Sequence, residues 1–282
     1  MLGMSRKELA AGCAASGLFF GFCVAAMELT GRFALPLIAA AAGFALLLLL
    51  TQLYRRIEDR IDDARSLSEA ALALYYELRP IAPLPLLRDY ALAPDSALLL
   101  CKLVRETAPK VVVETGSGVS TLVIGYELKA LGKGGRLISL ELDERYAQRT
   151  REEVARHGLS EWVTVVHAPL CEVIVEGRSY RWHDPRALEG VAAIDLVFDD
   201  GPPLYLGRAL RDAALPLLQA KLAPDAVYCI NYVAAEERRT VAHWLARDPA
   251  LHAEWIKTKK GNVVLRRPSS SDVTAPSTSL LS

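Results

Sequence analysis

Two long apolar runs lie near the start of the chain. Residues 9–27 and residues 33–54 contain no Asp, Glu, Lys or Arg. Each run is long enough to cross a bilayer as a helix, since a span needs about 20 apolar residues. Only five residues, 28–32, separate the runs. The pattern therefore predicts two transmembrane helices that form an antiparallel hairpin within residues 1–54.

Basic residues are distributed unevenly around this predicted hairpin. Those on the outer flanks of the two runs are Arg6, Lys7, Arg55, Arg56 and Arg60, and Arg32 alone lies between the runs. The positive-inside rule then predicts a multi-pass membrane protein with both termini in the cytoplasm. Two alternatives stay open: a signal peptide cleaved near Val24, and two buried helices of a soluble core.

A different periodicity follows the second apolar run. Apolar residues recur every three or four positions among charged ones, at Leu53, Ile57, Ile61, Ala64, Leu67, Ala71 and Leu74. This spacing predicts an amphipathic helix, either a stalk that packs on the next domain or a coiled coil that makes a homodimer. Pro80, Pro83 and Pro85 should end the helix. Residues 55–95 are thus expected to be a juxtamembrane helix and a Pro-rich linker.

Short apolar runs alternate with helical periodicity from residue 96 onward. The predicted strands are 110–115, 136–141, 162–167, 194–199 and 225–231, followed by an antiparallel hairpin of 252–258 and 261–267. This alternation predicts an α/β domain over residues 96–267, with a mostly parallel, Rossmann-like sheet covered by helices on both faces. Ser, Thr and Pro dominate residues 268–282, which we expect to be a disordered tail.

One glycine-containing turn carries the main chemical signal. The string VVVETGSGVSTLVIGYEL, residues 111–128, predicts a buried strand that ends near Glu114, a turn with Gly116 and Gly118, and a helix that starts near Ser120. Glycines let backbone amides approach a ligand closely, and a helix amino terminus favours an anionic group. A turn of this kind also occurs as plain packing, so its context matters.

The second predicted strand supplies that context. Glu141 follows Gly118 by 23 residues, where a carboxylate can accept hydrogen bonds from both hydroxyls of a ribose. The two features indicate a cofactor that contains adenosine. Thr121 stands where a dinucleotide site has its third glycine, and Glu114 suits the ammonium group of a methionine moiety. These residues favour S-adenosylmethionine (SAM) over NAD.

Residues 90–267 resemble the class I SAM-dependent methyltransferases. The matching strings are ETGSG, LELDE, VTVVHAPL and DLVFDDGPP. The resemblance implies a SAM site that comprises Glu114, Gly116, Ser117, Gly118, Ser120, Glu141, Leu142, His167, Ala168 and Asp199. It also implies that Asp199 and Asp200 lie beside the methyl-transfer position, where either is a candidate general base.

The chain departs from the metal-assisted, catechol-type members of this group. Those enzymes carry an Asp-Asn pair after the fifth strand, where this chain has Ile230 and Asn231. Because isoleucine cannot ligate a cation, we predict no resident metal. The string RSYRWHDP before the fourth strand predicts a polar loop, with Tyr180, Trp182, His183 and Asp184 as acceptor-side candidates or plain surface residues.

The composition of the chain limits the classes of partner that the sequence supports. The 33 basic and 33 acidic residues cancel, so nothing favours a nucleic-acid partner. Five scattered cysteines fit neither a disulfide framework nor a zinc site. The leading hypothesis is a membrane-anchored methyltransferase that acts on a small-molecule or lipid-linked acceptor. The alternatives are a catalytically silent SAM-binding scaffold and an NAD-dependent oxidoreductase.

Overall fold

The computed structural model describes most of the chain in two compact units, Met1–Ala64 and Arg65–Ser282. The described residues are 17–19, 21, 22, 24, 25, 28, 34–87, 91–175, 177–202, 206, 207 and 210–267. Most of the first predicted span, residues 9–27, lies outside them, as does the predicted tail, residues 268–282. Both therefore stay predictions.

Helix α2, Ala34–Leu78, is a single element of 45 residues. It contains the second apolar run and continues without a break through the predicted boundary after residue 54. Within the described part of the chain it is the one helix long and apolar enough to cross a membrane. A hairpin of two such helices therefore has no support in the described residues. The side chains of Leu46, Leu47 and Leu49 are 57%, 61% and 63% exposed.

The carboxyl-terminal part of α2 packs on the second unit, to which it belongs. Leu74 is fully buried and Leu78 nearly so, and both join a core cluster of the α/β domain. Arg79 follows with a φ of 44°, and the Pro-rich segment begins there. A helix that ends before Pro80 agrees with the prediction, but Ile57 and Ile61 of the predicted apolar face are 47% and 60% exposed. The packing of its last part fits a stalk.

The second unit is built on a seven-stranded sheet with the order β3-β2-β1-β6-β7-β9-β8. Its strands are β1 (Val111–Thr115), β2 (Arg136–Glu141), β3 (Val163–His167), β6 (Ile194–Asp199), β7 (Leu222–Asn231), β8 (His252–Ile256) and β9 (Asn262–Arg266). The helices are α3 (Pro94–Thr107), α4 (Val119–Leu131), α5 (Glu144–Arg156), α6 (Ala214–Leu218) and α7 (Ala235–Arg247), with short 3-10 turns η2 (Pro185–Leu188) and η4 (Gln219–Lys221).

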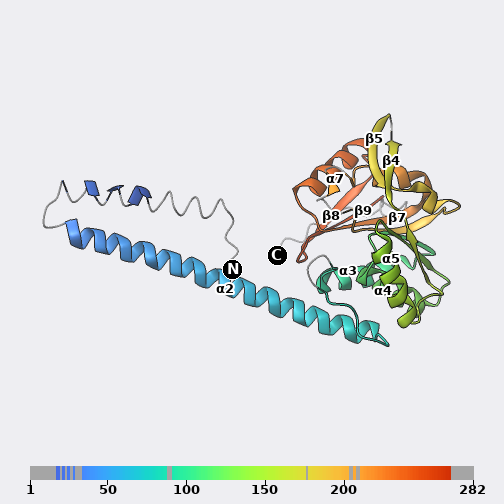
Figure 1. Cartoon of the computed structure of the whole chain (residues 1–282), viewed down its shortest axis with the longest axis horizontal. Coiled ribbons are helices and arrows are strands. Elements are labelled where there is room, and N and C mark those ends of the chain that lie inside the picture. Colours follow the sequence, from blue (N-terminus) through green and yellow to red (C-terminus); the bar gives the residue numbers. More distant parts are fainter. Residues whose placement is uncertain are drawn as a thin grey trace, which may run out of the picture. The chain divides into compact units, whose positions relative to one another are not determined.

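The strand directions are those of a Rossmann-like sheet. The strands β3, β2, β1, β6 and β7 are parallel, and β9 runs antiparallel between β7 and β8. All seven strands match the strands predicted from the sequence. Figure 1 shows α3, α4 and α5 on one face of the sheet and α7 on the other.

Alternate residues of the central strands fill two separate cores. On β1, Val112 belongs to the core beneath α3 and α4, whereas Val111 and Val113 belong to the core beneath α6 and α7. Every residue of β1 is buried. A continuous apolar run in the sequence thus corresponds to a strand covered on both faces, as parallel sheets require.

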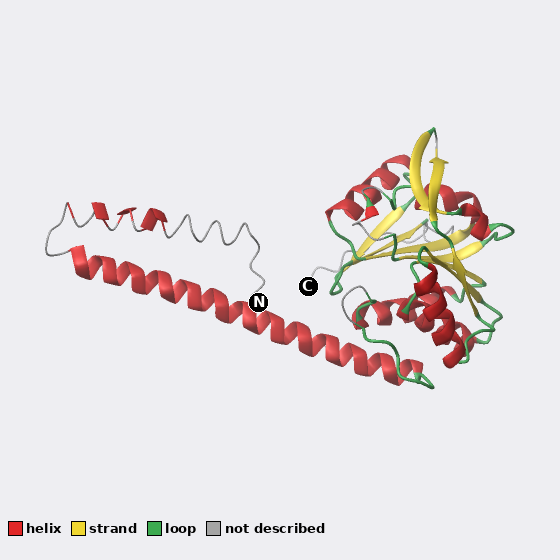
Figure 2. Ribbon diagram, viewed as in Figure 1, coloured by secondary structure: helices red, strands yellow, loops and turns green. Residues whose placement is uncertain are grey.

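The predicted polar loop RSYRWHDP is wrong for most of its length. Residues Arg178–His183 form β5, which pairs antiparallel with β4, Leu170–Val175, as a separate hairpin. Figure 2 shows these two strands standing apart from the main sheet. Trp182 is 1% exposed and His183 is fully buried. Only the last two residues of β5 are buried, so the segment has no alternating apolar pattern, and its sequence is typical of a loop.

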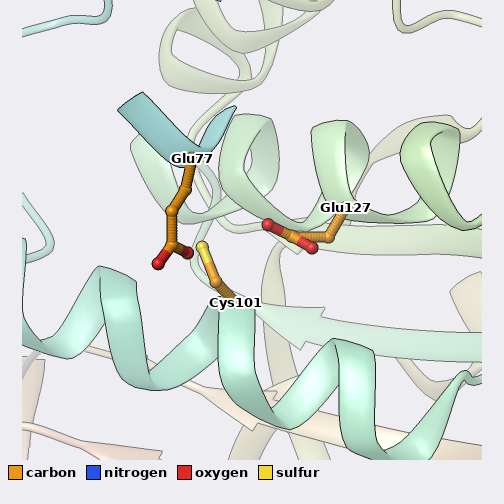
Figure 3. Close-up of side chains that lie close together, drawn as sticks. All are labelled: Glu77, Cys101 and Glu127. Carbon is orange, nitrogen blue, oxygen red and sulfur yellow. The ribbon is translucent and has the colours of Figure 1, made fainter. Parts of the chain in front are cut away.

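A charged cluster joins α2, α3 and α4. Figure 3 shows Glu77, Cys101 and Glu127 turned toward one another, with their ligand atoms within 4.8 Å. Arg105 already binds both acids: its guanidinium donates to Glu127 at 2.6 and 2.7 Å and lies 2.9 Å from Glu77. Burial and the nearby Glu127 carboxylate raise the pKa of the Cys101 thiol. Arg105 therefore supplies the positive charge that this cluster needs.

Candidate functional site

The polar residues singled out in the sequence meet at one edge of the sheet. Strands β1, β2 and β6 end side by side, with Thr115 in register with Leu140 on one side and Asp199 on the other. In an open α/β sheet, the carboxyl ends of the strands form the ligand crevice. The adjacent positions Glu114 and Glu141 reach the same edge.

The turn after β1 needs its glycines for two different reasons. Gly116 has a φ of +83°, and a Cβ there would lie 3.0 Å from the backbone oxygen of Asp200. Gly118 has a φ of +152°, but a Cβ there would meet nothing within 4 Å. The first glycine lets the turn pack against the end of β6. The second leaves space at the amino end of α4 that a ligand can fill.

Glu114 is a fully buried carboxylate with one free oxygen. Its Oε2 accepts hydrogen bonds from Thr121 and Ser139, each at 2.6 Å, whereas Oε1 has no partner among the described residues. Burial raises the pKa of Glu114 to about 7, and the neighbouring hydroxyls offset this only in part. A buried carboxylate oxygen without a partner is costly, so a cationic donor at this position would be stabilising.

Glu141 closes the other side of the turn. Its Oε2 accepts hydrogen bonds from the backbone N–H of Ser117 at 3.0 Å and from the Ser117 hydroxyl at 2.8 Å. Its Oε1 accepts from the Asp143 N–H at 3.2 Å. The carboxylate predicted to hold a ribose therefore also fixes the glycine turn, which links the two parts of the predicted cofactor site.

The remaining predicted cofactor residues are spread around this edge. Ser120 is buried in the first turn of α4, and Leu142 is half-buried directly after β2. Ala168 is fully buried, and its N–H donates to the Glu141 backbone oxygen at 2.7 Å. His167 points elsewhere: its side chain is 37% exposed, and Nδ1 lies 3.1 Å from Glu144. His167 is thus the least integrated member of the predicted set.

His183 supports this edge from the hairpin that the sequence did not predict. Its Nδ1 lies 2.8 Å from the Ala168 backbone oxygen, which holds the end of β3 in place. Burial lowers the pKa of His183, so the ring is neutral near pH 7. The residue is not on a surface loop, but it braces a segment of the predicted adenine pocket.

Asp199 and Asp200 have different environments although they are neighbours. Asp199 is fully buried and accepts hydrogen bonds from Thr115 at 2.9 Å and from the Tyr228 hydroxyl at 2.7 Å. Asp200 is half-buried, and burial raises the pKa of its carboxyl to about 6 against the lowering effects of Arg211 and Asn231. Asp199 therefore fixes the strand ends, and Asp200 is the acid more accessible for chemistry.

Arg211 is a member of the site that sequence analysis did not select. It is 5% exposed, its Nη1 donates to the Asn231 backbone oxygen at 2.8 Å, and its Nε lies 3.8 Å from Asp199 Oδ1. Its Nη1 also lies 4.0 Å from Glu237 Oε1. The segment around Arg211 has no clear periodicity, and its only sequence signal is that it follows the DDGPP strand end.

The oxygen atoms considered as metal ligands are largely engaged within the chain. Both Asp199 oxygens have donors, and Asn231 Oδ1 accepts from the Asn262 amide at 3.1 Å. Arg211 brings a positive charge to the same place. The prediction that the chain needs no metal is untested by these contacts, but they are compatible with it.

The described geometry fits a SAM-type ligand by two independent features. The free, buried Glu114 Oε1 can accept from an ammonium group, and the open space beside Gly118 can take the ligand's methionine portion. Glu141 lies on the adjacent strand end, at the place where a ribose acid belongs. The site is thus organised for a cofactor with an amino-acid end and a ribose.

Comparison with known proteins gives the class. Residues 113–233 match a family model described as a methyltransferase domain. An O-methyltransferase from Bacillus cereus, solved with S-adenosylhomocysteine (SAH), is 17% identical, with a TM-score of 0.50 over 72% of this chain and 91% of that chain. A SAH-bound methyltransferase from Podospora anserina is 14% identical, with a TM-score of 0.51 over 76% and 96%. These two structures share the fold.

The α/β domain thus contains a segment, residues 113–233, that is similar to a methyltransferase domain. The chain is therefore an enzyme, and SAM is its cofactor. The Rossmann-like fold and the cofactor predicted from the sequence are confirmed. The comparisons give no support to the NAD-dependent oxidoreductase, and they favour an enzyme over a silent scaffold.

Proposed function

We propose that this chain is a membrane-anchored O-methyltransferase whose catalytic domain faces the cytoplasm. Its acceptor is a hydroxyl group on a small-molecule or lipid-linked compound that reaches the domain at the membrane. The observation that carries this proposal is that the two acids at the end of β6 have different environments. Asp199 is held by Thr115 and Tyr228, which leaves Asp200 as the carboxylate available to an acceptor.

The proposed cofactor-binding residues belong to the same carboxyl edge of the sheet. Glu114 receives the ammonium group, and Glu141 receives the ribose hydroxyls. Ser120 and the turn Gly116–Gly118 surround the methionine portion, and Leu142, His167 and Ala168 border the adenine. SAM supplies a methyl group on a positively charged sulfur. The role of the chain is to hold that group in line with the acceptor and to exclude water, which accounts for much of the acceleration in such displacements.

Asp200 acts as the general base. A carboxyl whose pKa is raised to about 6 is a better base than an ordinary aspartate, and most of it is still ionised near pH 7. It accepts the proton of the acceptor hydroxyl while an oxygen lone pair forms the new bond to the methyl carbon. With SAM bound, the carbon–sulfur bond would break with its electron pair going to sulfur. An oxygen acceptor is supported by the name of the similar Bacillus cereus enzyme, an O-methyltransferase.

The apolar half of α2 supports the anchor. Its leucines are exposed in the isolated chain, where a bilayer would cover them at a gain of about 25 cal/mol per Å². The Thr51 hydroxyl in this stretch is satisfied within the helix, since it donates to the Leu47 carbonyl at 2.8 Å. Residues 9–27, the first apolar run, are proposed as the other transmembrane span. Arg55 and Arg56 follow the second run, and by the positive-inside rule they favour a cytoplasmic domain.

Methyl transfer is tested directly with labelled SAM. Membranes that contain the full chain are incubated with methyl-tritiated SAM and the lipid and soluble extracts of the same cells, and label in each fraction is measured. We expect wild-type chain to label an extract, Asp200→Asn to lose most of that label, and Asp225→Asn, a change at an exposed position of β7, to retain it. Equal labelling by wild type and Asp200→Asn would contradict the proposed base.

The topology is tested by cysteine accessibility in intact cells. Thr30→Cys lies between the two predicted spans, and Ser270→Cys follows the domain. An impermeant thiol reagent should label the first variant from outside and the second only after lysis. Labelling of both variants from outside would contradict the cytoplasmic placement of the domain. Labelling of neither variant from outside would contradict a transmembrane span at residues 9–27.

A further inference from the structure

The carboxyl edge of the sheet holds a buried cation that the proposed chemistry has not used. Arg211 is 5% exposed, and three groups surround it: the Asn231 carbonyl at 2.8 Å, Asp199 Oδ1 at 3.8 Å and Glu237 Oε1 at 4.0 Å. Its Nε has no hydrogen-bond partner among the described residues. A buried guanidinium with an unpartnered nitrogen lowers stability, so its presence here indicates that the charge has a function.

The position of Arg211 relative to the acids is specific. Asp199 ends β6, and the backbone oxygen of the next residue, Asp200, would lie only 3.0 Å from a Cβ on Gly116 in the cofactor turn. Arg211 also lowers the pKa of Asp200, so its field reaches that carboxylate. Lys260 acts in the same direction, but it is only half-buried and its Nζ donates to the Ala91 carbonyl at 2.6 Å.

The charges at this edge matter because methyl transfer removes a positive charge from sulfur. Two uncompensated carboxylates would bind the sulfonium of SAM more tightly than the neutral thioether of SAH. Such binding stabilises the ground state, and it is lost as the transition state is reached, so it slows the transfer. A fixed cation that offsets one carboxylate removes this penalty and leaves the other carboxylate ionised as a base.

We propose that Arg211 is a positioning residue that supplies the fixed counter-charge for Asp199 at the methyl-transfer position. Asn231 and Glu237 hold the guanidinium in place, and Arg211 thereby sets how strongly the site distinguishes the sulfonium of SAM from the thioether of SAH. This inference rests on the proposed function, because it requires that SAM binds at the edge formed by β1, β2 and β6. It needs neither an acceptor nor a metal.

The test is the ratio of two dissociation constants, Kd for SAM divided by Kd for SAH, measured by calorimetry on the full-length chain at one pH. The two ligands share every group except the methyl, so a change that affects folding or the shared contacts cancels in the ratio. Arg211→Gln should lower the ratio by about threefold or more, because the uncompensated acids then favour the sulfonium. Arg211→Lys keeps the charge and should leave the ratio within about twofold of wild type.

Two further variants keep the test decisive. Glu237→Gln removes the acid on the other side of Arg211 without changing its shape, and it should raise the ratio. Arg186→Gln removes an exposed arginine that pairs with Asp184, and it should leave the ratio unchanged. If Arg211→Gln does not fold, an unchanged ratio in Glu237→Gln overturns the inference by itself.

The failures of the two proposals differ. A wild-type chain that binds neither SAM nor SAH at this site would overturn the cofactor placement and the inference with it. Normal SAH binding in every variant, with the same ratio in wild type and in Arg211→Gln, would overturn the inference alone. In that case Arg211 would be a structural residue that secures the end of β7 through Asn231.

Discussion

The second unit contains two clusters of charged residues that are satisfied in different ways. Between the helices, both oxygens of Glu127 accept hydrogen bonds from Arg105, which also pairs with Glu77. At the carboxyl edge of the sheet, Glu114 Oε1, Arg211 Nε and Glu237 Oε1 lack hydrogen-bond partners among the described residues. Both clusters are charged, but among the residues that the structure describes only the first contains no buried polar atom that lacks a hydrogen bond.

The difference separates a structural role from a binding role. A buried ion pair with good geometry holds elements together, whereas a buried polar atom without a partner costs about 1–3 kcal/mol. The helix cluster therefore fastens α2, α3 and α4, and removal of one member should affect stability. The edge cluster is prepared for a ligand, and removal of one member should affect binding or turnover first. Four predictions test this distinction.

The largest effect is expected for Asp200→Asn. Loss of a general base lowers turnover by about a hundredfold or more, while SAH still binds. The turnover of the wild-type chain should survive excess EDTA, because Arg211 already places a cation at this edge. The measurement is label transfer from SAM under both conditions. Loss of wild-type turnover in EDTA, restored by Mg²⁺, would mean that an acceptor or water completes a metal site here.

Glu141→Ala should come next. It removes a charged acceptor from the ribose and from Ser117, and each such hydrogen bond contributes about 1.5 to 3 kcal/mol. SAH affinity, measured by calorimetry, should therefore fall by about tenfold or more. Glu152→Ala, at an exposed position of α5, is the matched control and should bind SAH like wild type. Equal affinity in Glu141→Ala would argue against the ribose assignment.

Arg105→Met should affect stability and leave binding intact. The change leaves the Glu127 carboxylate, 3% exposed, without its main partner. Because Arg105 is 44% exposed and water screens part of the pair, we expect a loss of about 2 kcal/mol in the free energy of unfolding. Urea unfolding of residues 65–282 within the full chain reports this loss. A large drop in SAH affinity in the folded variant would show that the two clusters are not independent.

The smallest effect is the pH dependence of SAH binding. Burial raises the pKa of Glu114 to about 7, and an ammonium group prefers the ionised carboxylate. Affinity should be nearly full at pH 8 and about tenfold lower at pH 6. Glu114→Gln should bind weakly at every pH, with a flatter profile. A steep profile that persists in this variant would place the titrating group elsewhere.

The raised pKa of Glu114 affects the stability of the unliganded chain in the opposite direction from SAH affinity. The folded pKa of Glu114 lies above its ordinary value of 4.5, so the folded state holds this proton more tightly than the unfolded state. The stability contributed by the protonated group is present below about pH 4.5 and is lost as the pH rises through about 7. Comparison of wild type with Glu114→Gln across this window isolates the contribution.

The part of the fold that the sequence predicts best is the part with the strongest local pattern. Val111–Val113 and Ile194–Phe198 form nearly continuous apolar runs, and both are buried central strands. The hairpin of β4 and β5 was missed because β5 has only two buried residues, Trp182 and His183, and they are adjacent, so no alternating pattern appears. A strand exposed along one face leaves little periodic signal when it is short.

The candidate site was predictable only where a residue follows its own strand. Glu114, Glu141, Asp199 and Asp200 belong to strand ends, so motif spacing located them. Their individual roles depend on contacts between distant segments: Tyr228 donates to Asp199 from 29 residues away, and Arg211 reaches Asn231 from 20 residues away. No local pattern encodes such contacts, so the sequence could not separate Asp199 from Asp200 or identify Arg211.

The place of β9 within the sheet has a consequence for biosynthesis. This strand, Asn262–Arg266, is the last strand among the described residues, yet it lies between β7 and β8. Asn262 accepts a hydrogen bond from Ser96 across 166 residues. Nascent domains generally fold from their amino-terminal end as they leave the ribosome. Here the edge of β7 has no neighbour until the final strand has been translated. The growing polypeptide is therefore exposed to wrong pairing until synthesis is nearly complete, and a premature stop before residue 262 would release a chain that chaperones and proteases recognise as unfinished.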